Sequence, residues 1–197
     1  MAIDVVLASG NRGKIAEFKG ALDPLGFHII PQTQLNVSDV AEDGLSFVEN
    51  AIIKARHASQ ETGLAAIADD SGLEAMALNG SPGIFSARYA GEHGNDQANN
   101  NKLIHELHNQ NDRRARFQCA LAFVRFANDP NPIISQASWH GEILKQAQGS
   151  NGFGYDPIFW IPELHKTSAE LEPAEKKQIS HRAKALTDLI QKLERDY

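Results

Sequence analysis

The sequence lacks several features that would assign it to a specialised class of protein. Cys119 is the only cysteine among 197 residues, so the chain forms neither an intrachain disulfide nor a cysteine-based metal site. No apolar run approaches the roughly 20 residues that span a membrane, and the N-terminal residues show no signal-peptide pattern. These absences favour a cytoplasmic protein without a membrane partner.

The chain also lacks an excess of positive charge. The formal net charge is −6 and no run of like charge forms a tail, so the chain has no electrostatic footprint for duplex nucleic acid. The length and the hydrophobic fraction of 42% suit an ordinary globular protein with one core, or with two lobes that share a sheet. We therefore expect an enzyme or a binding protein whose partner is a small molecule rather than a nucleic acid.

The start of the chain predicts a strand, a loop with two glycines and a helix. Residues 3–8 are mostly apolar and predict a central strand, and a helix with one apolar face follows. Backbone N–H groups at a helix start and the charge of Lys14 both favour an anion, which predicts a phosphate-binding loop. It is not a Walker A loop, because Ile15 follows the lysine where a Ser or Thr is needed. The loop consists of Ser9, Gly10, Asn11, Arg12, Gly13 and Lys14.

Two adjacent acids form the centre of the pattern. The apolar run 64–68 ends in Asp69, Asp70, Ser71 and Gly72, which predicts a buried strand running out into a loop. Ligands bind at strand ends in open α/β sheets. Neighbouring carboxylates repel one another unless a cation or a donor lies between them, and Mg²⁺ suits a site with few carboxylates and substrate phosphates. A solvated turn is the alternative.

A third acid, Glu42, stands just before a second predicted helix. Ser46 and Glu49 have the spacing of a capping box, which predicts a helix that continues to about Ser59. Glu42 could face the end of the first strand, although a solvated loop position is the commoner fate of a glutamate. Lys54, on the same helix, is interpreted as solvated.

The middle of the chain predicts a further helix and a hairpin. Asp96 is placed to cap a helix that carries three asparagines on its polar side. Residues 116–126 alternate as a long strand, and residues 133–140 are its expected antiparallel partner. A hairpin beside helix-connected strands indicates a mixed sheet with a second lobe.

An aromatic turn and a closing helix complete the pattern. In residues 152–157, glycines flank aromatic side chains, so that Phe153 or Tyr155 offers a stacking face to a flat ligand. The alternative is a tight turn that leads into a strand over 158–161. A helix is predicted from Pro173 onward.

Four stretches, taken in this order and spacing, closely resemble the inosine triphosphate pyrophosphatase family, and within it the bacterial dITP/XTP pyrophosphatases. The resemblance runs from the first strand to the last helix. The stretches are Ser9-Gly10-Asn11-Arg12-Gly13-Lys14, Ala68-Asp69-Asp70-Ser71-Gly72, Gly152-Phe153-Gly154-Tyr155-Asp156-Pro157 and Ser180-His181-Arg182.

The resemblance implies a Mg²⁺-dependent hydrolase. It would convert the non-standard purine nucleotides dITP, ITP and XTP to the nucleoside monophosphate and pyrophosphate, which keeps them out of DNA and RNA. The implied fold is α/β, with a mixed, elongated central sheet and helices on both faces. Residues 1–197 would form a single domain of two lobes that share the sheet around a cleft, and the chain would form a homodimer.

The resemblance also implies residue roles. Asp70 would be the metal-linked proton acceptor and Glu42 the second acidic metal ligand, with the adjacent Asp43 as the alternative. The loop Ser9–Lys14 would hold the triphosphate. The other implied substrate-binding residues are Ser71, Phe153, Gly154, Tyr155, Asp156, Lys176 (or the adjacent Lys177), His181 and Arg182.

The residue chemistry agrees with these roles. Attack of water at the α-phosphorus requires neutralised phosphate charge and a group that accepts the proton, which Lys14 and Asp70 supply, with Asp69 structural. His181 and Arg182 are candidate donors to the 6-oxo group of the base, a group that adenine lacks. Three alternatives stay open: a non-hydrolytic nucleotide-binding protein, a single-stranded nucleic-acid binder, and a phosphatase with an aspartyl nucleophile.

Overall fold

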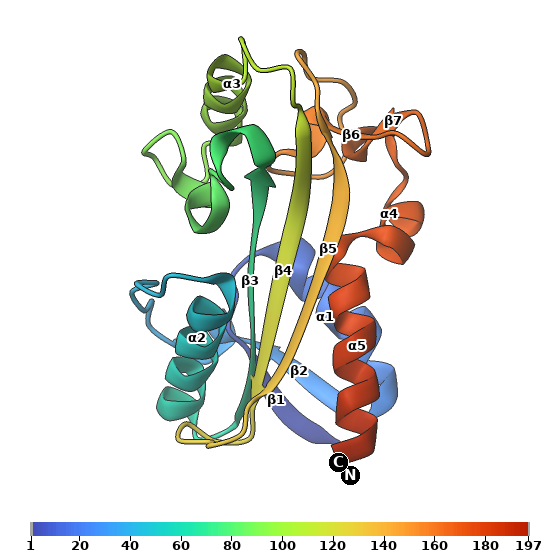
Figure 1. Ribbon diagram of the computed structural model, residues 1–197. Helices are drawn as coiled ribbons and strands as arrows, with labels where there is room; N and C mark the ends of the chain where they lie inside the picture. Colours follow the sequence, from blue (N-terminus) through green and yellow to red (C-terminus); the bar gives the residue numbers. More distant parts are fainter. Residues whose placement is uncertain (1, 197) are drawn as a thin grey trace. The chain divides into compact units, whose positions relative to one another are not determined.

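The computed structural model describes residues 2–196, and the chain divides into two compact units. Unit 1 runs up to Asp70, includes Cys119–Ala137 and resumes at Arg182, and unit 2 comprises Ser71–Gln118 and Ser138–His181. The strands form one seven-stranded sheet in the order β2-β1-β3-β4-β5-β6-β7 (Figure 1). Strands β3 (Ala65–Ala75), β4 (Arg114–Val124) and β5 (Ile133–Ile143) each contribute residues to both units.

The sheet is mixed, which confirms the predicted fold class. Strand β1 (Ile3–Leu7) pairs in parallel with β2 (Phe27–Pro31) and with β3. Strand β6 (Phe159–Ile161) pairs antiparallel with β5 and with β7 (Lys166–Thr167).

Five α-helices are described: α1 (Arg12–Leu22), α2 (Phe47–Thr62), α3 (Asp96–Glu106), α4 (Pro173–Ile179) and α5 (His181–Asp196). Short 3₁₀ helices are η1 (Asp23–Leu25), η2 (Gln32–Gln34), η3 (Met76–Leu78), η4 (Gly83–Arg88), η5 (Asp156–Ile158) and η6 (Ser168–Glu170). Over the described residues, none of the helices has the length and apolar character needed to cross a membrane.

In unit 1, helices cover both faces of the sheet. Side chains alternate between the two faces of a strand, and β3 shows the consequence. Ile67 packs in a cluster with Phe18 of α1 and Leu189 of α5, whereas Ala66 packs in a cluster with Ala55 of α2. Helix α2 therefore lies on one face, and α1 and α5 lie on the other (Figure 1).

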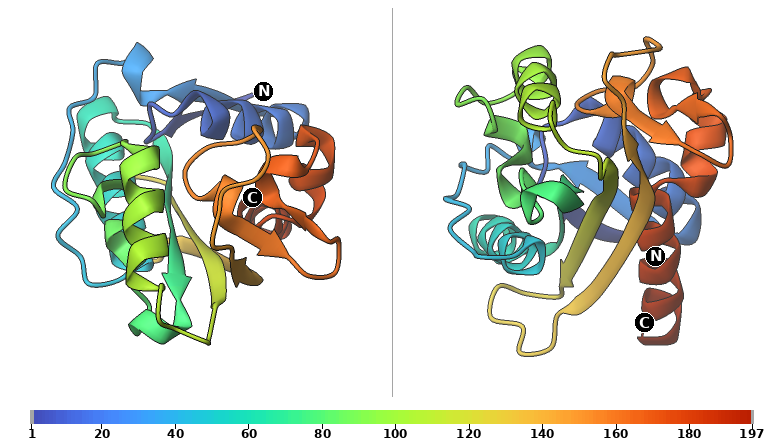
Figure 2. Two further views of the ribbon diagram at one scale, coloured as in Figure 1. Left: turned by 90° about the horizontal axis from the view of Figure 1, so that it is seen from above. Right: turned by 45° about the horizontal axis from the view of Figure 1, so that its top comes forward.

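Unit 2 has its own core. Leu73 of β3 and Leu103 of α3 belong to one buried cluster with the rings of Phe117, Trp139 and Phe159. Seen from above, α3 runs alongside the end of β3 (Figure 2). The ring centroids of Phe117 and Phe159 are 4.6 Å apart, so aromatic side chains pack directly against one another in this core.

The predicted end of the strand at Asp69 is wrong. Strand β3 continues through both acids, Ser71 and Gly72 to Ala75. A strand can hold two acids in its interior when each carboxylate has its own cationic or amide partner, and both have one here. The single closing helix is likewise wrong, because Ser180 stands in an extended conformation between α4 and α5.

Candidate active site

The predicted phosphate-binding loop is the N-terminal cap of α1. The side chain of Asn11 accepts a hydrogen bond from the Lys14 N–H at 3.0 Å, and Ser9 Oγ accepts one from the Asn11 N–H at 3.2 Å. Arg12, Gly13 and Lys14 therefore form the first turn of the helix rather than a loop before it. This turn contains no acidic residue and is largely exposed, so its N–H groups present a positive end to an anion, whereas the ammonium of Lys14 is paired with a carboxylate of the sheet.

Asp69 is fully buried and bound by cations. Its carboxylate accepts a hydrogen bond from Arg182 Nε at 2.7 Å and pairs with the ammonium of Lys14, and the Cys119 thiol lies 3.5 Å from Oδ2. Burial opposes its ionisation, but Arg182 and Lys14 outweigh this effect and hold the pKa of Asp69 well below its usual range. Asp69 is therefore a permanent anion that links α1, β3 and α5.

Asp70 has a different environment. Lys54 Nζ donates to its Oδ1 at 2.7 Å, and Asn50 Nδ2 lies 3.4 Å from its Oδ2. Burial raises the pKa of Asp70 to about 6, with Lys54 opposing the shift and Glu42 adding to it. A carboxyl group with a pKa near neutrality exchanges a proton readily at physiological pH, as a general base must.

The two acids face opposite sides of the sheet, because they are consecutive residues of one strand. Asp69 meets Lys14 and Arg182 on the face covered by α1 and α5, whereas Asp70 meets Lys54 on the face covered by α2. Their mutual repulsion, expected from the sequence, is thus relieved by separate cations on separate faces. Lys54 is mostly covered, with 15% of its side chain exposed, and its ammonium is paired with Asp70, so its interpretation as solvated is wrong.

Glu42 and Asp70 converge on one cation. Lys54 Nζ lies 3.0 Å from Glu42 Oε2 and 2.7 Å from Asp70 Oδ1. Burial raises the pKa of Glu42, but Lys54 and the contact with Asp70 outweigh it and lower that pKa overall. Asp43 is exposed, so of the two adjacent acids it is Glu42 that shares a cation with Asp70.

The donor set fits Mg²⁺. Within residues 2–196 there is no group of three or more histidine, cysteine, aspartate or glutamate side chains that could hold a metal ion. Two carboxylates that contact the same ammonium group are also close enough to share a metal ion. Mg²⁺ is usually held by one or two carboxylates together with substrate phosphates and water. Glu42 and Asp70 are the residues that could hold it.

The aromatic turn of unit 2 exposes one ring and buries the other. Phe153 is 41% exposed, whereas Tyr155 is 4% exposed and donates its hydroxyl to the Ser86 carbonyl at 2.8 Å. Tyr155 is an anchor in the core, and Phe153 is the ring of this turn that is exposed. Lys176 Nζ lies 5.2 Å from the centroid of the Phe153 ring, within the range of a cation–π contact.

Asp156 holds this turn together. Its carboxylate accepts hydrogen bonds from the Phe153 N–H at 2.9 Å and the Ser168 hydroxyl at 2.8 Å, and it pairs with the Lys176 ammonium. Lys176 is mostly buried in this pair and Lys177 is exposed, and the choice of Lys176 as a substrate-binding residue stays a prediction.

His181 and Arg182 belong to different units. His181 stacks on Phe117 in unit 2, with centroids 4.8 Å apart. Arg182 is bound to Asp69 and, at 3.1 Å, to Glu17 in unit 1. Its guanidinium therefore has a structural task, and its role as reader of a base stays a prediction, as does the contact of half-buried Ser71 with substrate.

Sequence reasoning missed Asn50 and Lys54. Both contact Asp70, and their spacing of four residues puts them on the same face of α2. That spacing is visible in the sequence, but the choice between a solvated face and one packed on the sheet depends on tertiary structure.

Parallel strands β1, β2 and β3, an exposed helix start without acidic residues after β1 and a buried acid pair on β3 define an α/β protein with the elements of the predicted nucleotide site. The chain belongs to the Ham1 family, which it matches over residues 5–192. A dITP/XTP pyrophosphatase of Vibrio parahaemolyticus is 56% identical over 191 residues, which cover 96% of each chain.

Solved structures agree. A HAM1 protein from Coxiella burnetii is 49% identical and superposes with a TM-score of 0.93 over 98% of this chain and 99% of its own. The nucleoside-triphosphatase, or dITP/XTP pyrophosphatase, of Mycobacterium abscessus is 40% identical, with a TM-score of 0.78 over 97% of this chain and 100% of its own.

Proposed function

We propose that this protein is a pyrophosphohydrolase that cleaves dITP, ITP and XTP to the nucleoside monophosphate and pyrophosphate. Relatives that are 56% identical to this chain are named dITP/XTP pyrophosphatases. The observation in this protein that carries the proposal is the acid pair of Glu42 and Asp70 on a single cation position, with the pKa of Asp70 raised to about 6.

The chemistry requires a proton acceptor and charge neutralisation. The oxygen of a water molecule attacks the α-phosphorus, the bond to the pyrophosphate oxygen breaks, and the proton of the water passes to the Asp70 carboxylate. The N–H groups of the first turn of α1 and the Lys14 ammonium bind the negative oxygens of the triphosphate. Because phosphoryl-type transfer depends mainly on positioning and electrostatics, these groups supply most of what the step needs.

Mg²⁺ is the proposed cofactor, held by Glu42 and Asp70. When bound, it neutralises phosphate charge and lowers the pKa of bound water. Lys54 occupies the position between the two carboxylates here, so we infer that its ammonium balances their charge when the metal is away.

The base is assigned to unit 2. The exposed ring of Phe153 would stack on any base, and selectivity for a 6-oxo purine requires donors, for which Lys176 and His181 are the candidates in this unit. Arg182 belongs to unit 1 and is bound to Asp69 and Glu17, so its implied part in base recognition is a separate prediction. We further propose that the enzyme acts in the cytoplasm as a homodimer, which light scattering coupled to size-exclusion chromatography tests by mass.

One assay separates the proposal from its alternatives. Purified protein is incubated with ITP and Mg²⁺, and pyrophosphate, orthophosphate and inosine monophosphate are measured together. We expect pyrophosphate and the monophosphate in equal amounts. Release of orthophosphate would indicate the aspartyl-nucleophile phosphatase, and binding of ITP without any release would indicate a non-hydrolytic binding protein.

Variants of the acids test the site. Asp70→Asn should lower kcat by about 10²–10⁴-fold, the usual contribution of a general base. Glu42→Gln should raise the Mg²⁺ concentration needed for half-maximal rate, and Asp43→Asn, an exposed neighbour with the same change in charge, should leave it unchanged. If Asp43→Asn has the larger effect on the Mg²⁺ requirement, the metal ligand has been assigned to the wrong acid.

A further inference from the structure

The backbone N–H and the backbone carbonyl of Gly154, in the aromatic turn, both form hydrogen bonds with side chains of one helix, α3. Asp96 Oδ2 accepts a hydrogen bond from the Gly154 N–H at 2.7 Å, and Asn100 Nδ2 donates one to the Gly154 carbonyl at 3.0 Å. Residues four apart lie on the same face of a helix, so α3 presents an acceptor and a donor to opposite sides of Gly154. Gly154 itself is in the left-handed region, with φ +63°.

Asn100 is unusual for an asparagine on a helix. It is 6% exposed, and its Oδ1 has no hydrogen-bond partner among the described residues. The orientation of the amide is fixed, because only its nitrogen can face the Gly154 carbonyl. Burial of an amide with one unpaired atom is unfavourable, so this side chain is not explained by the stability of the helix alone.

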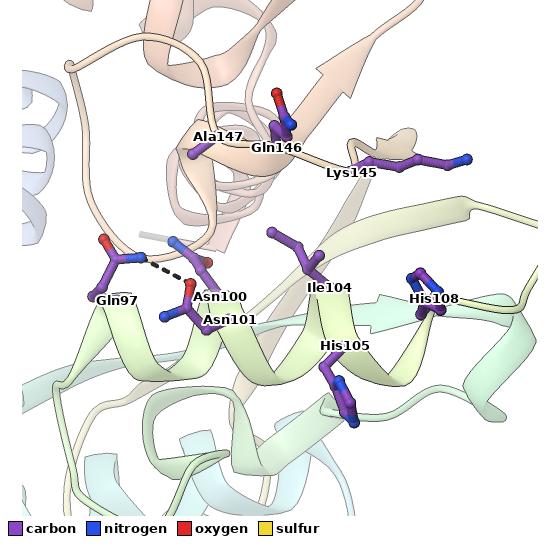
Figure 3. A pocket seen from close by; sticks show the side chains of 9 residues that line it. All are labelled: Gln97, Asn100, Asn101, Ile104, His105, His108, Lys145, Gln146 and Ala147. Carbon is purple, nitrogen blue, oxygen red and sulfur yellow. Dashed lines mark hydrogen bonds between the residues drawn. The ribbon is translucent and has the colours of Figure 1, made fainter.

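Its neighbour behaves as an ordinary surface residue. Asn101 is exposed and accepts a hydrogen bond from Gln97 at 2.9 Å. Figure 3 shows this pair joined along the helix, with the Asn100 amide beside it at the wall of a groove that Lys145 and Ala147 also line. Asn100 and Asn101 are thus chemically identical residues with different environments on the same helix.

A second contact holds α3 to the segment that anchors the same turn. Asn99 Oδ1 accepts a hydrogen bond from the Ala90 N–H at 2.7 Å. The segment before Ala90 contains Ser86, whose carbonyl receives the Tyr155 hydroxyl. Helix α3 therefore supports the turn directly at Gly154 and indirectly through the anchor of Tyr155.

We propose that Asp96 and Asn100 are positioning residues for the base-binding turn, residues 152–156. Glycines at 152 and 154 leave the backbone on both sides of Phe153 with few steric restrictions, and the Phe153 ring is exposed. Fixing the Gly154 peptide lowers the conformational freedom that the turn must lose when a base stacks on Phe153. This inference rests on the proposed function, because it assigns the turn to the base.

The test compares the binding of the two reaction products, the monophosphate that carries the base and the pyrophosphate that does not. Binding of inosine monophosphate and of inorganic pyrophosphate is measured by calorimetry for the wild type, Asp96→Ala, Asn100→Ala and the control Asn101→Ala. We expect both positioning variants to bind the monophosphate about tenfold more weakly, with affinity for pyrophosphate within about twofold of the wild type. In steady state, KM for ITP should rise about tenfold with kcat nearly unchanged, the pattern of lost ground-state binding.

Conservative variants separate positioning from general structure. Asp96→Asn keeps an acceptor for the Gly154 N–H and should retain most of the affinity for the monophosphate. Asn100→Asp replaces the donor with an acceptor that faces the Gly154 carbonyl, so it should bind no better than Asn100→Ala. Melting temperatures are recorded for every variant, and a comparison is drawn between variants that are folded at the assay temperature.

Three outcomes would overturn the inference. They are an equal loss of affinity for both ligands, a loss in Asn101→Ala as large as in Asn100→Ala, or unchanged monophosphate binding in folded Asp96→Ala and Asn100→Ala. If the wild type releases pyrophosphate from ITP and the variants bind normally, only this inference fails. If the wild type neither binds the monophosphate nor releases pyrophosphate, the proposed function fails with it.

Discussion

Replacing Asp69 by asparagine should destabilise the fold more than any other single change of charge in the candidate site. The side chain is fully buried, and the substitution keeps its shape while removing its charge. Arg182, itself buried, and Lys14 would then lose the anion that compensates them. Arg182 would keep Glu17 at 3.1 Å, so the loss of compensation is partial.

The size of the effect follows from the burial. Removing one partner of a buried ion pair typically costs about 3–5 kcal/mol, because the other charge stays buried without compensation. Arg182 keeps its contact with Glu17, and the Lys14 side chain is partly exposed to solvent. We therefore expect a loss of unfolding free energy at the lower end of this range, about 3 kcal/mol. For a chain of this length each kcal/mol shifts the melting temperature by about 2–4 °C, which predicts a decrease of roughly 6–12 °C.

The assay is urea unfolding at pH 7, with Asp70→Asn as the matched control. That variant makes the same change one residue along the strand, but Lys54 keeps Glu42 at 3.0 Å and burial already disfavours the charged form of Asp70. We expect it to change the free energy of unfolding by less than about 1 kcal/mol. In a cycle with Arg182→Met, the Asp69→Asn and Arg182→Met losses should be clearly less than additive.

A small effect would refute this reasoning. If Asp69→Asn unfolds within about 1 kcal/mol of the wild type, or if Asp70→Asn is the less stable of the two, then the buried pair contributes little to the fold. Strictly additive losses in the cycle would show that Asp69 and Arg182 do not interact energetically.

Three further predictions concern the metal site, acid stability and the start of α2. Lys54→Met should lower the melting temperature in EDTA, and Mg²⁺ should reduce the difference because it replaces the lost cation; a difference that Mg²⁺ leaves unchanged argues against the site. Hydrogen bonds from Arg125 hold the pKa of Asp129 well below its usual range, so its stabilisation is complete above its unfolded pKa of about 3.9 and is lost as the pH falls toward the folded value. Urea unfolding between pH 7 and pH 3 should therefore show a steeper loss of stability in the wild type than in Asp129→Asn, and equal slopes would contradict this. Gly44→Ala places a Cβ atom 2.6 Å from a side-chain carbon in the first turn of α2, the helix that carries the Lys54 partner of Asp70, so displacement of this helix should lower kcat. In Gly20→Ala the added Cβ atom meets nothing within 4 Å, so this control should leave kcat unchanged and should not lower the melting temperature.

Local chemistry made much of the candidate site predictable. The apolar run of β1 and the glycine-bearing stretch after it are signals between near neighbours in sequence, and they place the start of α1 close to where the structure has it. The metal-binding roles of Glu42 and Asp70 stay predictions from the family resemblance, to which the structure adds that both carboxylates contact Lys54.

The partners of those acids could not be predicted. Arg182 meets Asp69 across 113 residues of sequence and Lys54 meets Asp70 across 16, and no local pattern specifies either pair. The continuation of β3 through the acids was missed for the same reason, since two carboxylates are tolerated inside a strand only when distant residues supply their partners. The contacts of Asp96 and Asn100 with Gly154 likewise depend on packing between segments that are more than 50 residues apart.

The alternation of β3 has a consequence for insertions and deletions. A shift of one residue in the register of this strand would exchange the two acids, turning Asp70 toward Arg182 and Asp69 toward Lys54, and would reverse every apolar neighbour at the same time. Substitutions at these positions remove one carboxylate, whereas a change in length removes both environments at once. We therefore expect the distance in sequence between the apolar residues of β3 and its acids to be fixed.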